Sequence, residues 1–189
     1  MRIFASSDLH FNHENIRKPE YCNRPFNSLE EMNNSIVNRW NETVSPEDRV
    51  FFLGDLAMGQ KIYHLDWLNS LNGEIMFIPG NHDRYLVKMD KQYGLHDLGV
   101  KNATMLPPLH NEMIDGRLFV MSHFPLEEWE GMPGHHSDGI GNSVMIHGHC
   151  HGSKGAKSAV NRYDIGIDNY GRPVELTADL RFLEDPKGW

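Results

Sequence analysis

The chain alternates short apolar runs with polar turns over much of its 189 residues. Residues 75–78 are four consecutive apolar side chains, which predict a short buried strand. Pro79 has no backbone donor and so ends the strand, and Gly80 allows a sharp turn. Residues 2–6 and 50–53 follow the same scheme and predict two further strands. Each of these strands is expected to stop at a polar turn.

Two segments between the strands have helical spacing. Ser28 followed by Glu31 is the pattern of a capping box, which marks the start of a helix. Apolar residues then recur on one face and predict an amphipathic helix over Leu29–Thr43. A second apolar set predicts a helix that ends at Asn72-Gly73; its members are Ile62, Leu65, Leu68 and Leu71. The order strand, helix, strand, helix, strand predicts a parallel sheet with right-handed crossovers.

The second half of the chain has a different pattern. Leu109–Ile114 and residues 117–121 flank Asp115-Gly116, which is a strong signal for a β-hairpin. Further apolar runs predict strands at 144–146 and 163–167, and a closing helix at 177–183. Residues 11–26 and 127–142 lack periodicity and predict long loops. Because no repeat or linker divides the chain, we expect one domain over residues 1–189.

Charge and composition narrow the classes of partner. The formal net charge of −8 argues against non-specific binding to nucleic acid, which requires a basic surface. A phosphorylated small molecule or a nucleotide is still compatible with this net charge. The charge of a bound metal ion can outweigh the negative field of the whole chain at the site. No apolar run reaches the length of about 18 residues that spans a membrane. The apolar run at the N-terminus is too short for a signal peptide, and two cysteines make no disulfide framework, so we expect a cytoplasmic protein.

Side chains with metal-binding chemistry follow five of the predicted strands. They are Asp8, His10, Asp55, Asn81, His82, Asp83, His123, His149 and His151. Ligands of open α/β sheets bind at the carboxyl ends of the strands, where these residues lie. Carboxylate, amide and imidazole donors without thiolates suit Mn²⁺, Zn²⁺ or Fe rather than a soft metal. There are too many donors for one ion, which indicates two ions about 3.5–4 Å apart.

In this order, the five groups resemble the five motifs of the calcineurin-like metallophosphoesterase superfamily. The matching segments are Asp8-Leu9-His10, Gly54-Asp55, Gly80-Asn81-His82-Asp83, Ser122-His123 and Gly148-His149-Cys150-His151. The stretch from Asp8 to Ile16 also resembles the small stand-alone phosphoesterases of bacteria and their phages. The resemblance covers positions 8 to 151. It implies an α/β fold, a four-layer α/β/β/α sandwich of two mixed sheets flanked by helices.

The resemblance also implies roles for the motif residues. Asp8, His10 and His151 would hold the first ion, and Asn81, His123 and His149 the second. Asp55 would bridge both ions. His82 would face the leaving group as a general acid, with Asp83 orienting its ring. Mn²⁺ is the preferred metal, with Fe, Zn and Ni as alternatives.

The implied activity is metal-dependent hydrolysis of phosphate esters, with a hydroxide that bridges the metals as the nucleophile. Phosphodiesters are favoured over phosphomonoesters, because the chain has little room for a separate cap domain. Cyclic nucleotides and dinucleotides stay open as substrates. The alternative function is a non-catalytic metal-binding scaffold of the same fold that binds a protein partner.

Several residues beside the motifs are further candidates. His13, Arg17 and Arg24 could hold phosphate, the arginines by bidentate pairing, although a solvated loop is an equal alternative. His147 would alternate with His149 and could support a ligand or contact substrate. Five histidines lie outside these groups, and all are expected at the surface: His64, His96, His110 and the pair His135-His136 in the predicted loop 127–142.

Overall fold

The computed structural model, which describes residues 1–134, 141–152, 160–177, 183, 186 and 188–189, contains two mixed β-sheets. The first sheet has the strand order β4-β3-β2-β1-β9. Four of its strands run parallel: β1 (Ile3–Ser6), β2 (Arg49–Phe52), β3 (Glu74–Phe77) and β4 (Ala103–Met105). The fifth, β9 (Val174–Glu175), is antiparallel to β1.

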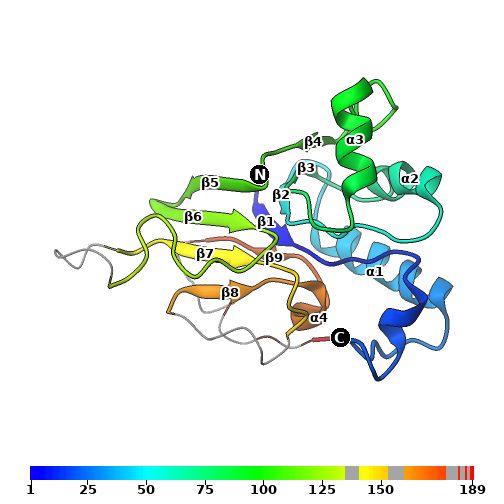
Figure 1. Ribbon diagram of the computed structural model, residues 1–189, viewed down its shortest axis with the longest axis horizontal. Coiled ribbons are helices and arrows are strands. Elements are labelled where there is room, and N and C mark those ends of the chain that lie inside the picture. Colours follow the sequence, from blue (N-terminus) through cyan, green and yellow to red (C-terminus); the bar gives the residue numbers. More distant parts are fainter. Residues whose placement is uncertain (135–140, 153–159, 178–182, 184–185, 187) are drawn as a thin grey trace.

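The second sheet has the order β5-β6-β7-β8. The hairpin partners β5 (Leu109–Ile114) and β6 (Arg117–Ser122) are antiparallel, whereas β7 (Val144–His147) and β8 (Arg162–Asp164) continue parallel to β6. Figure 1 shows this sheet beside the first, with α1, α2 and α3 beyond the first sheet. Their bounds are α1 (Leu29–Thr43), α2 (His64–Asn69) and α3 (Arg84–Tyr93); a short α4 (Ile167–Tyr170) follows β8.

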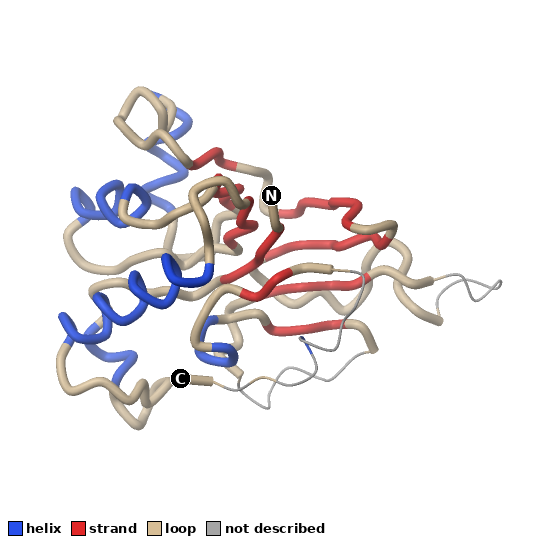
Figure 2. Tube along the Cα trace, turned by 180° about the vertical axis from the view of Figure 1, so that it is seen from behind, coloured by secondary structure: helices blue, strands red, loops and turns tan. Residues whose placement is uncertain are grey.

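The strands of the first sheet bury side chains on both faces. Phe4, Val50 and Phe52 belong to the core that also contains apolar residues of α1. Ala5 and Phe51 belong to the core that includes residues of the second sheet such as Phe119. Successive strand residues point to opposite faces, so a strand covered on both sides reads as a continuous apolar run. The helices gather on one side of the strands in the view from behind (Figure 2).

The main sequence predictions of the fold are confirmed. The strands expected at 2–6, 50–53 and 75–78 are β1, β2 and β3, and they are parallel. α1 has the predicted bounds, and Ser28 Oγ accepts a hydrogen bond from the Glu31 backbone at 3.0 Å. The hairpin turns at Asp115-Gly116, where both residues have positive φ. Two mixed sheets flanked by helices therefore form the predicted architecture. None of the described helices is both long and apolar enough to cross a membrane.

Other elements differ from the predictions. The helix expected around 62–71 is a 3-10 turn (η2, Lys61–Tyr63) followed by α2. The predicted strand at 163–167 is the shorter β8, because Ile167 already begins α4. The sequence analysis did not predict α3, β4, α4 or β9. Most of the predicted helix at 177–183 lies outside the described residues, as do residues 135–140 of the predicted loop 127–142.

The segment 11–26 is a long loop, as its lack of periodicity predicted, and a few buried residues anchor it. Phe11 is buried and stacks on Trp67 with ring centroids 4.2 Å apart. A 3-10 turn (η1, Glu14–Arg17) follows and buries Ile16. Residues 18–21 are exposed.

Candidate metal centre

The predicted ligands come together at the carboxyl ends of strands from both sheets. Asp8 and His10 follow β1, and their backbone amides donate to the carbonyl oxygens of Gly54 and Asp55 at 2.9 and 3.0 Å. The backbone of Gly148, which follows β7, donates to the carbonyl oxygen of His123 after β6 at 3.0 Å. These backbone hydrogen bonds tie neighbouring turns together, so side chains distant in sequence lie in one cluster.

Five of the candidate ligands have left-handed backbone conformations. Their φ angles are 60° for Asp8, 50° for His10, 58° for Asp55, 67° for His149 and 50° for His151. Such values are uncommon in residues other than glycine, and each costs about 1–3 kcal/mol. Strained residues of this kind cluster at functional sites, where the surrounding structure holds them in place. The strain therefore supports a functional role for these turns.

The first cluster contains Asp8, His10 and His151. The Asp8 Oδ1 atom lies 3.9 Å from His10 Nε2 and 3.8 Å from His151 Nε2. Burial raises the pKa of Asp8 to about 6. His10 Nε2 is buried and has no hydrogen-bond partner among the described residues. A buried imidazole nitrogen without a partner, facing a buried carboxylate, fits a site that receives a cation.

The second cluster is centred on Asp55. Its Oδ2 atom lies 3.4 Å from His123 Nε2 and 3.5 Å from His10 Nε2, so this carboxylate joins the two clusters. The Asn81 Oδ1 atom lies 3.0 Å from His123 Nε2. The ring of His149 lies 5.2 Å from that of His123. Carboxylate, amide and imidazole donors thus converge from four different turns.

Hydrogen bonds to the second ring nitrogen orient two of the histidines. His123 Nδ1 lies 2.7 Å from the carbonyl oxygen of Leu53, and His151 Nδ1 lies 2.7 Å from Asp168 Oδ2. In the neutral ring, a proton on Nδ1 leaves the Nε2 lone pair free toward the carboxylates, the usual arrangement of metal-binding histidines. The Asp and His clusters can therefore hold a divalent metal ion, and their chemistry fits one.

Comparison with known proteins agrees with this geometry. The family model described as calcineurin-like phosphoesterase matches residues 1–187. The chain belongs to this family. The gene 66 protein of Mycobacterium phage L5 is 27% identical over 187 residues, which cover 89% of this chain and 87% of that protein.

Two further relatives are similar in part of the sequence or in fold. An uncharacterised protein of Methanocaldococcus jannaschii is 49% identical over 86 residues, or 44% of this chain, and the match spans about half of that protein (48%). A protein of unknown function from Aquifex aeolicus has a similar fold, with a TM-score of 0.62 at 19% identity. That similarity covers 92% of this chain and 95% of the other. The family match confirms the resemblance seen in the five motifs.

Asp83 has different partners from those that we predicted for this phosphoesterase. Its Oδ2 atom accepts hydrogen bonds from the backbone amides of Asp55 and Gly80, both at 2.7 Å, and Oδ1 accepts from Leu56 at 3.0 Å. No hydrogen bond joins its carboxylate to the His82 ring within the described part of the chain. Asp83 therefore holds the turns after β2 and β3 together, and the orienting role predicted for it is corrected.

Arg24 is a structural residue of this family member. Its side chain is fully buried, and it donates to Asp168 through Nε at 2.7 Å and Nη2 at 2.9 Å. It also donates to the carbonyl oxygens of Asp8 at 2.6 Å and Leu9 at 2.7 Å. Every nitrogen of the guanidinium is thus occupied. The structure supports neither alternative, phosphate binding or a solvated side chain.

The other candidates beside the motifs have mixed surroundings. Arg17 donates to the carbonyl oxygen of Phe26 at 3.1 Å and pairs with Glu14. His13 is partly exposed, with its Nδ1 atom 3.3 Å from His10 Nδ1, so it lies at the edge of the first cluster. His147 is buried, with Nδ1 2.8 Å from the Gly148 carbonyl oxygen. Of these residues, His13 is the best placed to approach a substrate.

Asp168 has a role that no sequence pattern predicted, and His64 is buried against the prediction. Asp168 lies in α4 without motif spacing, yet it contacts both Arg24 and the candidate ligand His151. Burial by itself would raise the pKa of Asp168, but Arg24 and His151 hold this pKa far below its usual range. His64 is only 4% exposed, against the prediction that it faces solvent, whereas the side chain of His96 is 85% exposed. His110 is partly buried.

We predict that Asp168→Asn weakens metal binding by about 10–100-fold, because a partner that orients a histidine ligand loses its charge. Metal affinity is measured by competition with a chelator, and folding by thermal unfolding. Asp97→Asn is the control, since this substitution makes the same chemical change at an exposed position. Unchanged metal affinity in a folded Asp168→Asn variant would contradict this role.

Proposed function

We propose that this chain acts as one domain that hydrolyses phosphate esters with two bound divalent metal ions. Asp8, His10 and His151 are assigned to the first ion. The second is assigned to Asn81, His123 and His149, with Asp55 shared. The observation that carries this proposal is the position of Asp55 Oδ2 between the imidazoles of His10 and His123.

The metals would supply charge for the phosphoryl oxygens and a nucleophile from water at neutral pH. Hard oxygen donors together with imidazoles favour Mn²⁺, and Fe, Zn and Ni are the alternatives. The protein contributes rigid placement of the donors. The turns are fixed by the backbone hydrogen bonds between them and by the Asp83 carboxylate.

His82 is assigned the role of general acid. Its side chain is 37% exposed, and its ring makes no hydrogen bond to a described residue. Its backbone amide donates to Asp55 Oδ1 at 2.9 Å, which anchors the residue beside the shared carboxylate. The ring centroid lies 5.4 Å from that of His10. His82 can therefore face a bound phosphate ester and give a proton to the departing oxygen.

The alternative is a non-catalytic scaffold that binds metal and a protein partner. Every motif position keeps its ligand-type residue, and His82 is open to solvent, so catalysis is better supported. The two functions are separated by metal analysis together with turnover of a chromogenic phosphate ester. Metal binding without turnover would favour the scaffold.

We predict that bis(p-nitrophenyl) phosphate is hydrolysed faster than p-nitrophenyl phosphate in the presence of Mn²⁺. A monoester dianion needs more positive charge around its free oxygens, and Arg24 and Arg17 are already paired within the protein. The two substrates share a leaving group, so the ratio of their kcat/KM values isolates the effect of the second ester group. A monoester preferred by about tenfold or more, a difference of about 1.4 kcal/mol, would instead support a phosphomonoesterase.

A further inference from the structure

A cavity of about 470 Å³ opens beside the candidate metal centre. We name it the His64 pocket. It is lined by the segment after β2, by the start of α2 and by the start of α3, and its residues are Ala57, Met58, Gly59, Lys61, His64, Asn81, His82, Arg84 and Tyr85. Its volume falls in the range of small-molecule sites, about 300–1,000 Å³. Asn81 and His82 belong to both the pocket and the metal centre, so the two are continuous.

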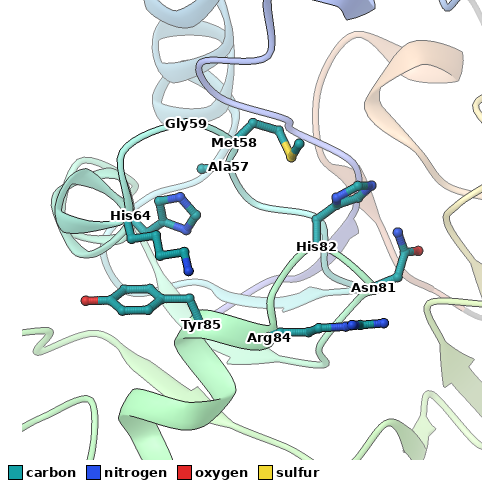
Figure 3. Close-up of a pocket in the computed structure, with 9 residues that line it drawn as sticks. Ala57, Met58, Gly59, His64, Asn81, His82, Arg84 and Tyr85 are labelled. Atoms are coloured by element: carbon teal, nitrogen blue, oxygen red, sulfur yellow. The ribbon is translucent and has the colours of Figure 1, made fainter.

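The two ends of the pocket differ in chemistry. Figure 3 shows His64 and Tyr85 on one side of the cavity, and His82 and Asn81 on the other. The His64 and Tyr85 rings lie edge to face with centroids 5.9 Å apart. Met58, whose side chain extends toward His82 in Figure 3, adds an apolar, polarisable group to the cavity. The end away from the metal centre is thus aromatic and suits a planar group.

His64 forms part of the wall at this aromatic end. The residue is buried, and neither ring nitrogen is exposed. Burial lowers the pKa of His64, although a hydrogen bond with the Met58 backbone acts in the opposite direction, so the neutral ring is favoured. The side chain therefore places an uncharged ring next to Tyr85.

Two cations flank the pocket. Lys61 Nζ lies 5.7 Å from the centroid of the Tyr85 ring, and the Arg84 side chain extends toward Asn81 (Figure 3). Both residues are exposed, and neither forms an ion pair with a residue that the structure describes. In a chain with a formal net charge of −8, two unpaired cations beside one cavity favour an anionic ligand.

We propose that the His64 pocket binds a nucleoside group that leaves from the scissile phosphate. The assignment of the leaving side rests on the proposed function, because His82 in the pocket wall is the general acid. The base would pack against Tyr85, while Arg84 and Lys61 attract the phosphate charge. In the reaction, water adds its hydroxide to phosphorus and releases its proton to solvent, and the bond from phosphorus to the nucleoside oxygen breaks. This oxygen takes a proton from His82, which solvent then protonates again.

The first test is direct binding, which requires neither turnover nor metal. Adenosine, guanosine, cytidine and uridine are titrated into the wild-type protein by calorimetry, with ribose as the control. At least one nucleoside is expected to bind with a Kd of about 1 mM or tighter, whereas ribose is not expected to bind. The proposal is overturned if no nucleoside binds saturably at up to about 10 mM, or if ribose binds equally well.

The second test removes the aromatic wall. Tyr85→Leu is expected to weaken nucleoside binding by about 5–100-fold. The matched Tyr93→Leu change, at an exposed tyrosine outside the pocket, leaves binding unaltered. Wild-type affinity in Tyr85→Leu, provided that the variant is folded, would overturn the proposal.

The third test separates this proposal from the proposed function. Hydrolysis of a deoxydinucleoside monophosphate is followed with Mn²⁺, with and without the nucleoside that binds. Competitive inhibition by that nucleoside supports the pocket assignment. Nucleoside binding without hydrolysis of any phosphate ester would reject the proposed function and leave the pocket as a nucleoside site. Hydrolysis of the dinucleotide with no effect of any nucleoside would overturn the pocket assignment alone.

Discussion

Asp55→Asn is expected to lower phosphoesterase activity by about 10³-fold or more, because the residue that serves both metal ions loses its charge. The Asp55 carboxylate lies within 3.5 Å of imidazole nitrogens from both clusters. An amide has a similar shape but only one good acceptor oxygen and no charge. The variant should therefore bind fewer metal ions per chain as well as turn over more slowly.

The measurement combines metal analysis of the purified protein with kcat/KM for bis(p-nitrophenyl) phosphate. Asp97→Asn makes the same chemical change on the surface, where the side chain is 82% exposed, and should match the wild type in both measurements. Thermal unfolding shows whether Asp55→Asn is folded, since Asp55 Oδ1 also accepts the backbone amide of His82. Full activity with two metals bound in Asp55→Asn would exclude a bridging role.

His82→Ala is expected to slow the hydrolysis of a nucleotide-type ester by about 10²–10⁴-fold, and that of an aryl ester distinctly less. An alkoxide leaving group needs a proton to depart, whereas p-nitrophenolate leaves readily without one. Metal content should stay near that of the wild type, because the proposed function assigns no metal ion to His82. The variant therefore tests proton donation to the leaving group and not metal binding.

His96→Ala is the control, since it removes an exposed histidine remote from the metal ligands in sequence. Asp83→Asn provides a contrast. The structure predicts that it destabilises the turns that Asp83 holds, without the dependence on leaving group expected of His82→Ala. If His82→Ala slows both kinds of ester equally, His82 positions the phosphate or the metals and is not the general acid.

The sequence by itself determined the parallel strands of the first sheet and the candidate ligands at their ends. Short apolar runs that stop at a glycine or a polar turn are local signals, and they predicted β1, β2 and β3. Because parallel strands of one sheet end at the same edge, Asp8, Asp55 and Asn81 could be placed together without a structure. α1 was predictable for the same reason, since its cap and its apolar face lie within its own residues.

Only the tertiary structure decided which polar groups serve other roles. Asp83 lies two residues after the candidate ligand Asn81, yet its carboxylate accepts hydrogen bonds from backbone amides 27 and 28 residues away. Asp168 pairs with Arg24 across 144 residues of sequence, and β9 exists only as a partner of β1. His64 was expected to face solvent, but the structure buries it beside the candidate metal centre. These partners are set by contacts distant in the chain, and no local pattern of residues encodes them.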